Sequence, residues 1–149
     1  MGGYLFDMII KLNMFAQNDL PLFILPDRLA VCRLPADSPV PDWARPGDLL
    51  AMVLTNDELS VVCTERFVPP DVRAERGWRA LQVQGPLEFA MLGVLASIAV
   101  PLAHAGVSIF VLSTFDTDYV LVNEDALDRA VGALNQAGFL VMNYVRLSS

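Results

Sequence analysis

The stretch Val107–Val122, VSIFVLSTFDTDYVLV, decides the fold that the sequence predicts. Two apolar runs, Val107–Ser113 and Asp118–Val122, are rich in the β-branched residues typical of strands. The connection between them holds hydroxyl and carboxylate side chains but no glycine, although Asn-Gly or Asp-Gly is usual in a tight hairpin turn. The polar cluster is therefore a candidate for a role beyond the turn.

The sequence on both sides of this hairpin has helical spacing. Before the hairpin, one apolar stripe recurs at intervals of three and four and ends at Gly106: Met91, Leu95, Ile98, Leu102 and Ala105. Ser97, Pro101 and His104 are predicted on another face of this helix. After the hairpin, Asn123 is the expected cap of a second helix, whose stripe is Leu127, Val131 and Leu134.

Two further strands, Trp78–Val83 and Phe139–Tyr144, flank the helices. The order β-α-β-β-α-β predicts an α+β chain with the split βαβ arrangement of ferredoxin-like folds. In that topology the strand Val107–Ser113 lies at a sheet edge. It is apolar on both faces, so we expect this edge to be covered, either by the first half of the chain or by a second chain.

The expected organisation is an N-terminal extension (1–19), a degenerate half-module (20–68), a linker (69–77) and a complete module (78–149). The linker PPDVRAERG interrupts the apolar pattern with prolines, alternating charges and a glycine. Val53–Glu65 can be aligned with Val111–Glu124 if one residue is inserted in the later connection, which indicates an internal repeat.

Composition excludes several classes of function. The chain has 149 residues, of which 54% are hydrophobic, and a formal net charge of −7, so a nucleic-acid partner is not expected. The longest apolar run, 89–103, is too short to span a membrane. Cys32 and Cys63 lie in strand-like runs without metal-ligand spacing, so we expect reduced, buried thiols and a cytoplasmic protein.

The sequence has no signature of catalysis. His104 is the sole histidine and is predicted on the surface. Asp116 and Asp118 are spaced like a metal pair, but no other ligand is placed to complete a shell. We therefore expect no metal, no cofactor and no enzymatic activity.

The start of the first helix is a second candidate for binding. Leu92, at the predicted cap position, has no side-chain oxygen to accept hydrogen bonds from the first backbone N–H groups of the helix. A ligand carboxylate could occupy them. Gly93 leaves room for close approach and is equally consistent with tight helix packing.

The run GVLASIAVPLAHAGVSIFVLSTFDTDYVLV resembles the ACT-domain family, in particular small tandem-ACT proteins similar to the regulatory modules of aspartate kinases and to arginine-sensing proteins. The resemblance implies binding of an amino acid at an interface between modules that pair through their second strands. It implies a homodimer that forms through the strand Val107–Ser113.

The same resemblance implies the site residues. The backbone at Met91, Leu92, Gly93 and Val94 would hold a ligand carboxylate, Ile109 would line the pocket, and Ser113, Thr114 and Asp118 would contact the polar end. Leu92 replaces the usual threonine of the family and Met91 replaces an acidic residue, which favours an apolar or small amino acid. The alternative is an assembly module that keeps the fold without a ligand.

Overall fold

The computed structural model describes residues 21–84 and 93–145. The chain divides into two compact units. The N-terminal unit contains residues 26–80, and the described part of the C-terminal unit contains residues 21–25, 81–84 and 93–145. The predicted extension, 1–19, lies outside the described residues.

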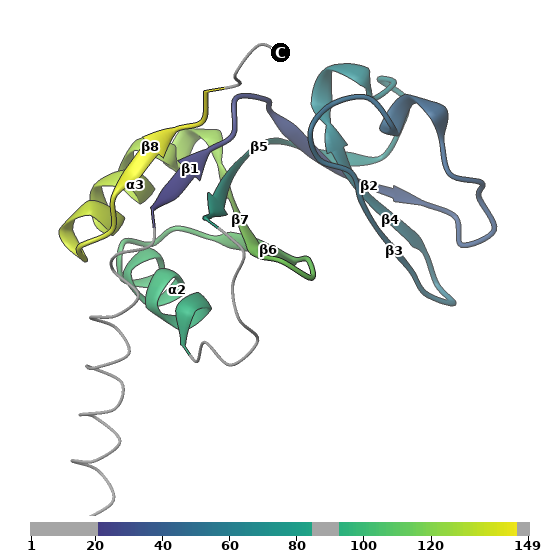
Figure 1. Cartoon of the computed structure of the whole chain (residues 1–149). Helices are drawn as coiled ribbons and strands as arrows, with labels where there is room; N and C mark the ends of the chain where they lie inside the picture. Colours follow the sequence, from purple (N-terminus) through teal and green to yellow (C-terminus); the bar gives the residue numbers. More distant parts are fainter. Residues whose placement is uncertain (1–20, 85–92, 146–149) are drawn as a thin grey trace, which may run out of the picture. The chain divides into compact units, whose positions relative to one another are not determined.

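The C-terminal unit has the predicted β-α-β-β-α-β order (Figure 1). Its elements are the end of β5 (Ala74–Val83), α2 (Val94–His104), β6 (Ile109–Ser113), β7 (Asp118–Asn123), η3 (Glu124–Ala126), α3 (Leu127–Gln136) and β8 (Val141–Asn143). The ferredoxin-like α+β fold is thereby confirmed. Among the described strands β6 pairs only with β7, so β6 lies at the sheet edge as predicted.

One strand of this unit was not anticipated. The short strand β1, Leu22–Ile24, lies between β5 and β8, antiparallel to β5 and parallel to β8. The strand order of the unit is therefore β8-β1-β5-β7-β6. Residues 22–24 had been assigned to the first half-module, whereas their contacts group them with the C-terminal unit.

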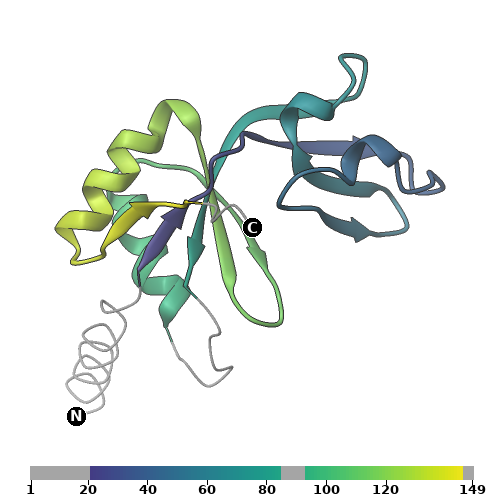
Figure 2. The ribbon, with the colours of Figure 1, turned by 45° about the horizontal axis from the view of Figure 1, so that its top comes forward.

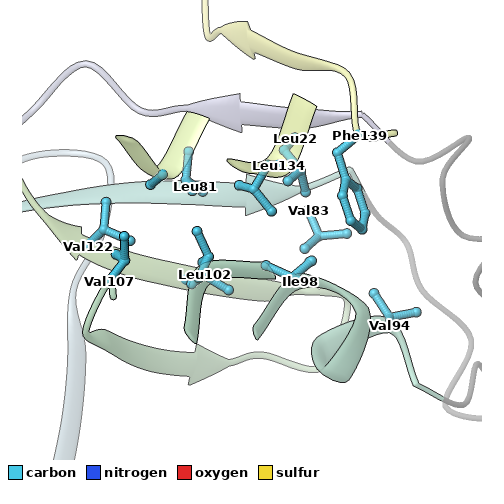
Figure 3. Packing of buried hydrophobic residues seen from close by; sticks show 12 residues of the cluster. Leu22, Leu81, Val83, Val94, Ile98, Leu102, Val107, Val122, Leu134 and Phe139 are labelled. Atoms are coloured by element: carbon cyan, nitrogen blue, oxygen red, sulfur yellow. The ribbon is translucent and has the colours of Figure 1, made fainter. Parts of the chain in front are cut away.

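Both helices of the C-terminal unit pack on one face of its sheet (Figure 2). Ile98 and Leu102 of α2 are fully buried against Leu81, Val83 and strand β7, while Leu134 of α3 closes the cluster (Figure 3). Ser97 was predicted on another face of α2 but is buried. Its Oγ donates to the carbonyl oxygen of Val94 at 2.6 Å, so the hydroxyl enters the core with its hydrogen bond satisfied within the helix.

The N-terminal unit contains β2 (Leu29–Leu34), η1 (Asp42–Ala44), β3 (Ala51–Leu54), β4 (Leu59–Thr64), η2 (Glu65–Phe67) and the first part of β5. Its strands follow the order β3-β4-β2-β5, all antiparallel. It buries an apolar cluster of its own, which includes Cys32 and Cys63. The expected linker, 69–77, lies within this unit, and its last residues begin β5.

The internal repeat is visible in the two hairpins. In both, a strand ends one residue before a threonine, Thr55 or Thr114, whose amide donates to the carbonyl oxygen three residues later. A short 3-10 turn then begins at Glu65 in one hairpin and at Glu124 in the other. The spacing from Thr55 to Glu65 equals the spacing from Thr114 to Glu124, so the inserted residue predicted in the later connection was wrong.

Candidate functional site

Hydroxyl groups shape the connection between β6 and β7. The Thr114 amide donates to the Thr117 carbonyl oxygen at 2.8 Å, and the Thr117 amide donates to Thr114 Oγ1 at 3.1 Å. Thr55 makes the equivalent contact in the other hairpin, where Oγ1 accepts from the amide of Glu58 at 3.2 Å. A threonine hydroxyl thus closes each turn, which explains why neither needs glycine.

Thr117 is a structural residue that the sequence analysis missed. Its hydroxyl is buried and donates to the carbonyl oxygen of Val83 at 2.6 Å, which ties the turn to the end of β5. The only signal in the sequence is its place one residue before a strand, which Glu58 shares in the other hairpin.

Ser113 and Asp118 are the pair that closes the β6–β7 ladder. They are direct partners in the register, and Ser113 Oγ donates to Asp118 Oδ1 at 2.7 Å. Because side chains alternate along a strand, Ser113 shares a face with Val111 and Ile109, which pack on the helix-side core. Both polar side chains therefore lie on the face that α2 covers.

The start of α2 is the second part of the candidate site. Gly93 is the N-cap residue, with a φ of 79° that favours glycine, and among the described residues no side chain caps the helix. Its carbonyl oxygen accepts the first helical hydrogen bond, from the Ser97 amide at 2.8 Å. The first turn carries no acidic residue, so its dipole favours an external anion.

These two parts lie at the same end of the C-terminal unit. The chain reverses direction between α2 and β6, so the end of the strand returns toward the start of the helix, as both views show (Figures 1 and 2). Gly93, Val94, Ser113, Thr114 and Asp118 share this end, and Ile109 contributes to the core farther along β6. Met91 and Leu92 fall outside the described residues.

The opposite face of the same sheet carries a second polar contact. Gln82 Nε2 donates to Tyr119 Oη at 3.1 Å, and Phe23 packs edge-on against Tyr144 with ring centroids 6.3 Å apart. Burial, and then the proximity of Tyr144 and Asp116, raise the pKa of Tyr119 above its ordinary value of 10.0. This face was not part of the predicted site.

The histidine and the two cysteines are the remaining groups for which the sequence makes a prediction. His104 is exposed, as predicted. Both cysteines are buried and free, also as predicted. A hydrogen bond to Cys32, together with burial, raises the pKa of the Cys63 thiol. Within the described ranges, no group of three or more histidine, cysteine, aspartate or glutamate side chains could hold a metal ion. No helix of the described chain has the length and hydrophobicity needed to cross a membrane.

Fold and site together define a ferredoxin-like module in which the start of α2 and the polar end of β6 lie at the same end. The ACT domain family model matches residues 73–136. A second model, which describes an N-terminal domain, matches residues 27–71. Residues 73–136 therefore belong to the ACT-domain family.

Solved structures share the fold of this chain. The crystal structure of protein Atu0741 from Agrobacterium tumefaciens is 35% identical, covers 87% of this chain and 97% of its own, and has a TM-score of 0.80. The regulatory subunit of aspartate kinase from Thermus thermophilus is 14% identical, covers 80% of this chain and 94% of its own, and has a TM-score of 0.51, which shows a shared fold.

A curated relative is similar over a shorter range. The cytosolic arginine sensor for mTORC1 subunit 1 from Homo sapiens is 40% identical over 60 residues, which is 40% of this chain. The matched range spans 18% of the length of that relative. The corresponding protein of Bos taurus matches to the same extent.

Proposed function

We propose that the protein is a non-catalytic, cytoplasmic regulator that binds a free amino acid at the end of the C-terminal unit where α2 begins and β6 ends. The observation that carries the proposal is the placement of Ser113 and Asp118 on the α2-covered face, at the end where the helix start has no side-chain cap. The backbone of Gly93 and Val94, with Met91 and Leu92 before them, would hold the ligand carboxylate.

The polar end of the ligand would meet Asp118. One carboxylate oxygen accepts from Ser113, which leaves the other for a ligand ammonium group. Ile109 would line the pocket, while the hydroxyl of Thr114 is engaged in the turn. Homology to regulatory domains of aspartate kinases and to an arginine sensor supports an amino acid as the ligand class.

The test is a thermal-shift screen of the full chain against the twenty amino acids, followed by calorimetry. A ligand at 100 times its dissociation constant adds about 2.7 kcal/mol of stability. Asp118→Asn should weaken binding about 10-fold while the unliganded melting temperature changes little, because an amide oxygen can still accept from Ser113. Asp116→Asn is the matched control and should bind like the wild type.

A second candidate is an assembly module without a ligand, which the unpaired, apolar edge of β6 favours. In that case no amino acid raises the melting temperature, and the two aspartate variants behave alike. Self-association would then persist without any added small molecule.

A further inference from the structure

A separate hollow in the N-terminal unit is not used by the site described above. It has a volume of about 220 Å³ and lies on the outer face of the sheet, over strands β2, β4 and β5. Arg33 pairs with Ser60 in the register, and the Arg33 amide donates to the Arg73 carbonyl oxygen at 2.9 Å. Residues directly opposite one another in antiparallel strands share a face, so these three side chains stand in one row.

The next pair of residues on this face brings a negative charge into the hollow. Val31 pairs with Glu75 and forms an apolar floor beside the charged side chains. Arg33 Nε lies 3.4 Å from Glu58 Oε2, so this arginine is partly neutralised. The lining thus holds two guanidinium groups and two carboxylates, Arg33, Arg73, Glu58 and Glu75.

Arg73 and Glu75 are the members that remain free. Within residues 21–84 and 93–145 neither side chain takes part in an ion pair or hydrogen bond, whereas Arg33 has both. They are two residues apart on one strand face, about 6.6 Å along the chain. Both residues are exposed, and a positive and a negative group at this spacing are complementary to a small molecule that carries both charges.

The positive and negative charges that line the hollow indicate which class of ligand it can bind. A purely anionic ligand would meet Glu58 and Glu75, and a purely cationic ligand would meet Arg33 and Arg73. The volume is below the range of about 300–1,000 Å³ typical of drug-sized ligands and suits a molecule the size of a free amino acid.

We infer that this hollow is a second binding site, for a small zwitterion with a short apolar side chain, whose carboxylate pairs with Arg73 and whose ammonium group pairs with Glu75. The side chain of the zwitterion rests on Val31. The site is contained within the N-terminal unit and does not depend on ligand binding in the C-terminal unit.

The experiment follows the Nε–Hε signals of arginine in the ¹⁵N-labelled full chain during titration. The probes are L-valine, isovalerate, which lacks the ammonium group, and isobutylammonium, which lacks the carboxylate. We expect L-valine to shift the Arg73 signal saturably, and each single-charge analogue to bind at least about 10-fold more weakly.

The variants locate the site. Arg73→Gln, which is followed through the Arg33 Nε–Hε signal because it removes that of Arg73, should weaken L-valine binding at least about 10-fold, and so should Glu75→Gln. Arg45→Gln, which removes an exposed charge of the same unit outside the hollow, should leave it unchanged. Asp118→Asn should also leave it unchanged, which separates this site from the one in the C-terminal unit. Shifts that do not saturate, or that are equal for all three probes or insensitive to Arg73→Gln, would overturn the inference.

Discussion

At the scale of single residues, the hydroxyl groups of the β6–β7 turn stabilise a tight connection that in other hairpins usually contains glycine. Thr117 holds the turn to β5 through its bond to the Val83 carbonyl oxygen. Thr117→Val keeps the shape of the side chain but leaves that buried acceptor without its donor, so we expect a loss of about 1–2 kcal/mol in the free energy of unfolding, measured in urea.

The control for this variant is Thr64→Val. The Thr64 hydroxyl is also buried but has no hydrogen-bond partner among the described residues. Its removal should cost clearly less than that of Thr117, or increase stability. Equal losses for the two variants would show that the bond to β5 contributes nothing specific.

The phenol of Tyr119 makes the free energy of unfolding depend on pH in the alkaline range. Its pKa is raised in the folded state, chiefly by burial, so the folded protein holds the phenol proton more tightly than the unfolded chain. That contribution is complete below the ordinary pKa of 10.0 and is lost as pH rises through the higher folded value. Tyr119→Phe should therefore reduce the slope of stability against pH above about 10.

The measurement compares urea unfolding at several alkaline pH values. Slopes are the readout because the variant also loses the Gln82 hydrogen bond at every pH. Tyr144→Phe should lower the slope by less than Tyr119→Phe, because the Tyr144 phenol is a smaller cause than burial of the raised pKa of Tyr119.

At the scale of elements, β6 is the strand whose surroundings matter most. Ile109 and Val111 lie on one face of this edge strand, and Phe110 and Leu112 lie on the other face. All four residues are partly buried. If two copies pair through β6, Phe110→Lys would place an ammonium group at the joint sheet. We expect this variant to be monomeric in light scattering at concentrations where the wild type is a dimer.

The control for the edge is Val100→Lys. Val100 is 52% exposed and belongs to α2 rather than to the edge strand, so the same charge there should leave the dimer intact. A monomeric wild type, or dissociation by both variants, would contradict pairing through β6.

Much of this element pattern could be predicted because its signals are local. The stripe of α2 and the edge position of β6 follow from spacing and from the order of the elements. Asn123 was predicted to cap the second helix, but it caps the 3-10 turn η3 before α3, where its side chain accepts from the Asp125 amide. The position of β1 could not be predicted, because a strand of three residues acquires its place from partners distant in the sequence. Ser97 was misplaced because its hydroxyl bonds within its own helix.

The candidate site likewise has one part that could be predicted from the sequence and one part that could not. The resemblance places Ser113 and Asp118 together at the polar end of the predicted site, and the two residues are partners in the register of β6 and β7. The bond from Thr117 to Val83 depends on the packing of strands far apart in the chain, so no local pattern indicates it. The hollow beside Arg73 requires three strands to be assembled before its charges become neighbours.

At the scale of the whole molecule, each unit has its own apolar cluster. A reagent that modifies exposed thiols should report the opening of the N-terminal unit alone, because Cys32 and Cys63 belong to its core. We expect slow labelling of Cys32 and Cys63 in the native protein. The labelling rate should rise in Val61→Ala, because Val61 belongs to the same cluster as the two cysteines. The rate should stay constant in Ile98→Ala, because Ile98 belongs to the C-terminal core. Equal acceleration by both truncations would show that the two cores open together.

The division of the chain also separates its natural spectroscopic reporters. Both tryptophans, Trp43 and Trp78, belong to the N-terminal unit, whereas both described α-helices belong to the C-terminal unit. Tryptophan emission therefore follows one unit, and ellipticity at the helical band follows mainly the other. A ligand that binds at the start of α2 can leave the tryptophan fluorescence unchanged, and a ligand that binds beside Arg73 can leave the helical ellipticity unchanged. Recording both signals in one titration would assign each binding event to its unit without a label.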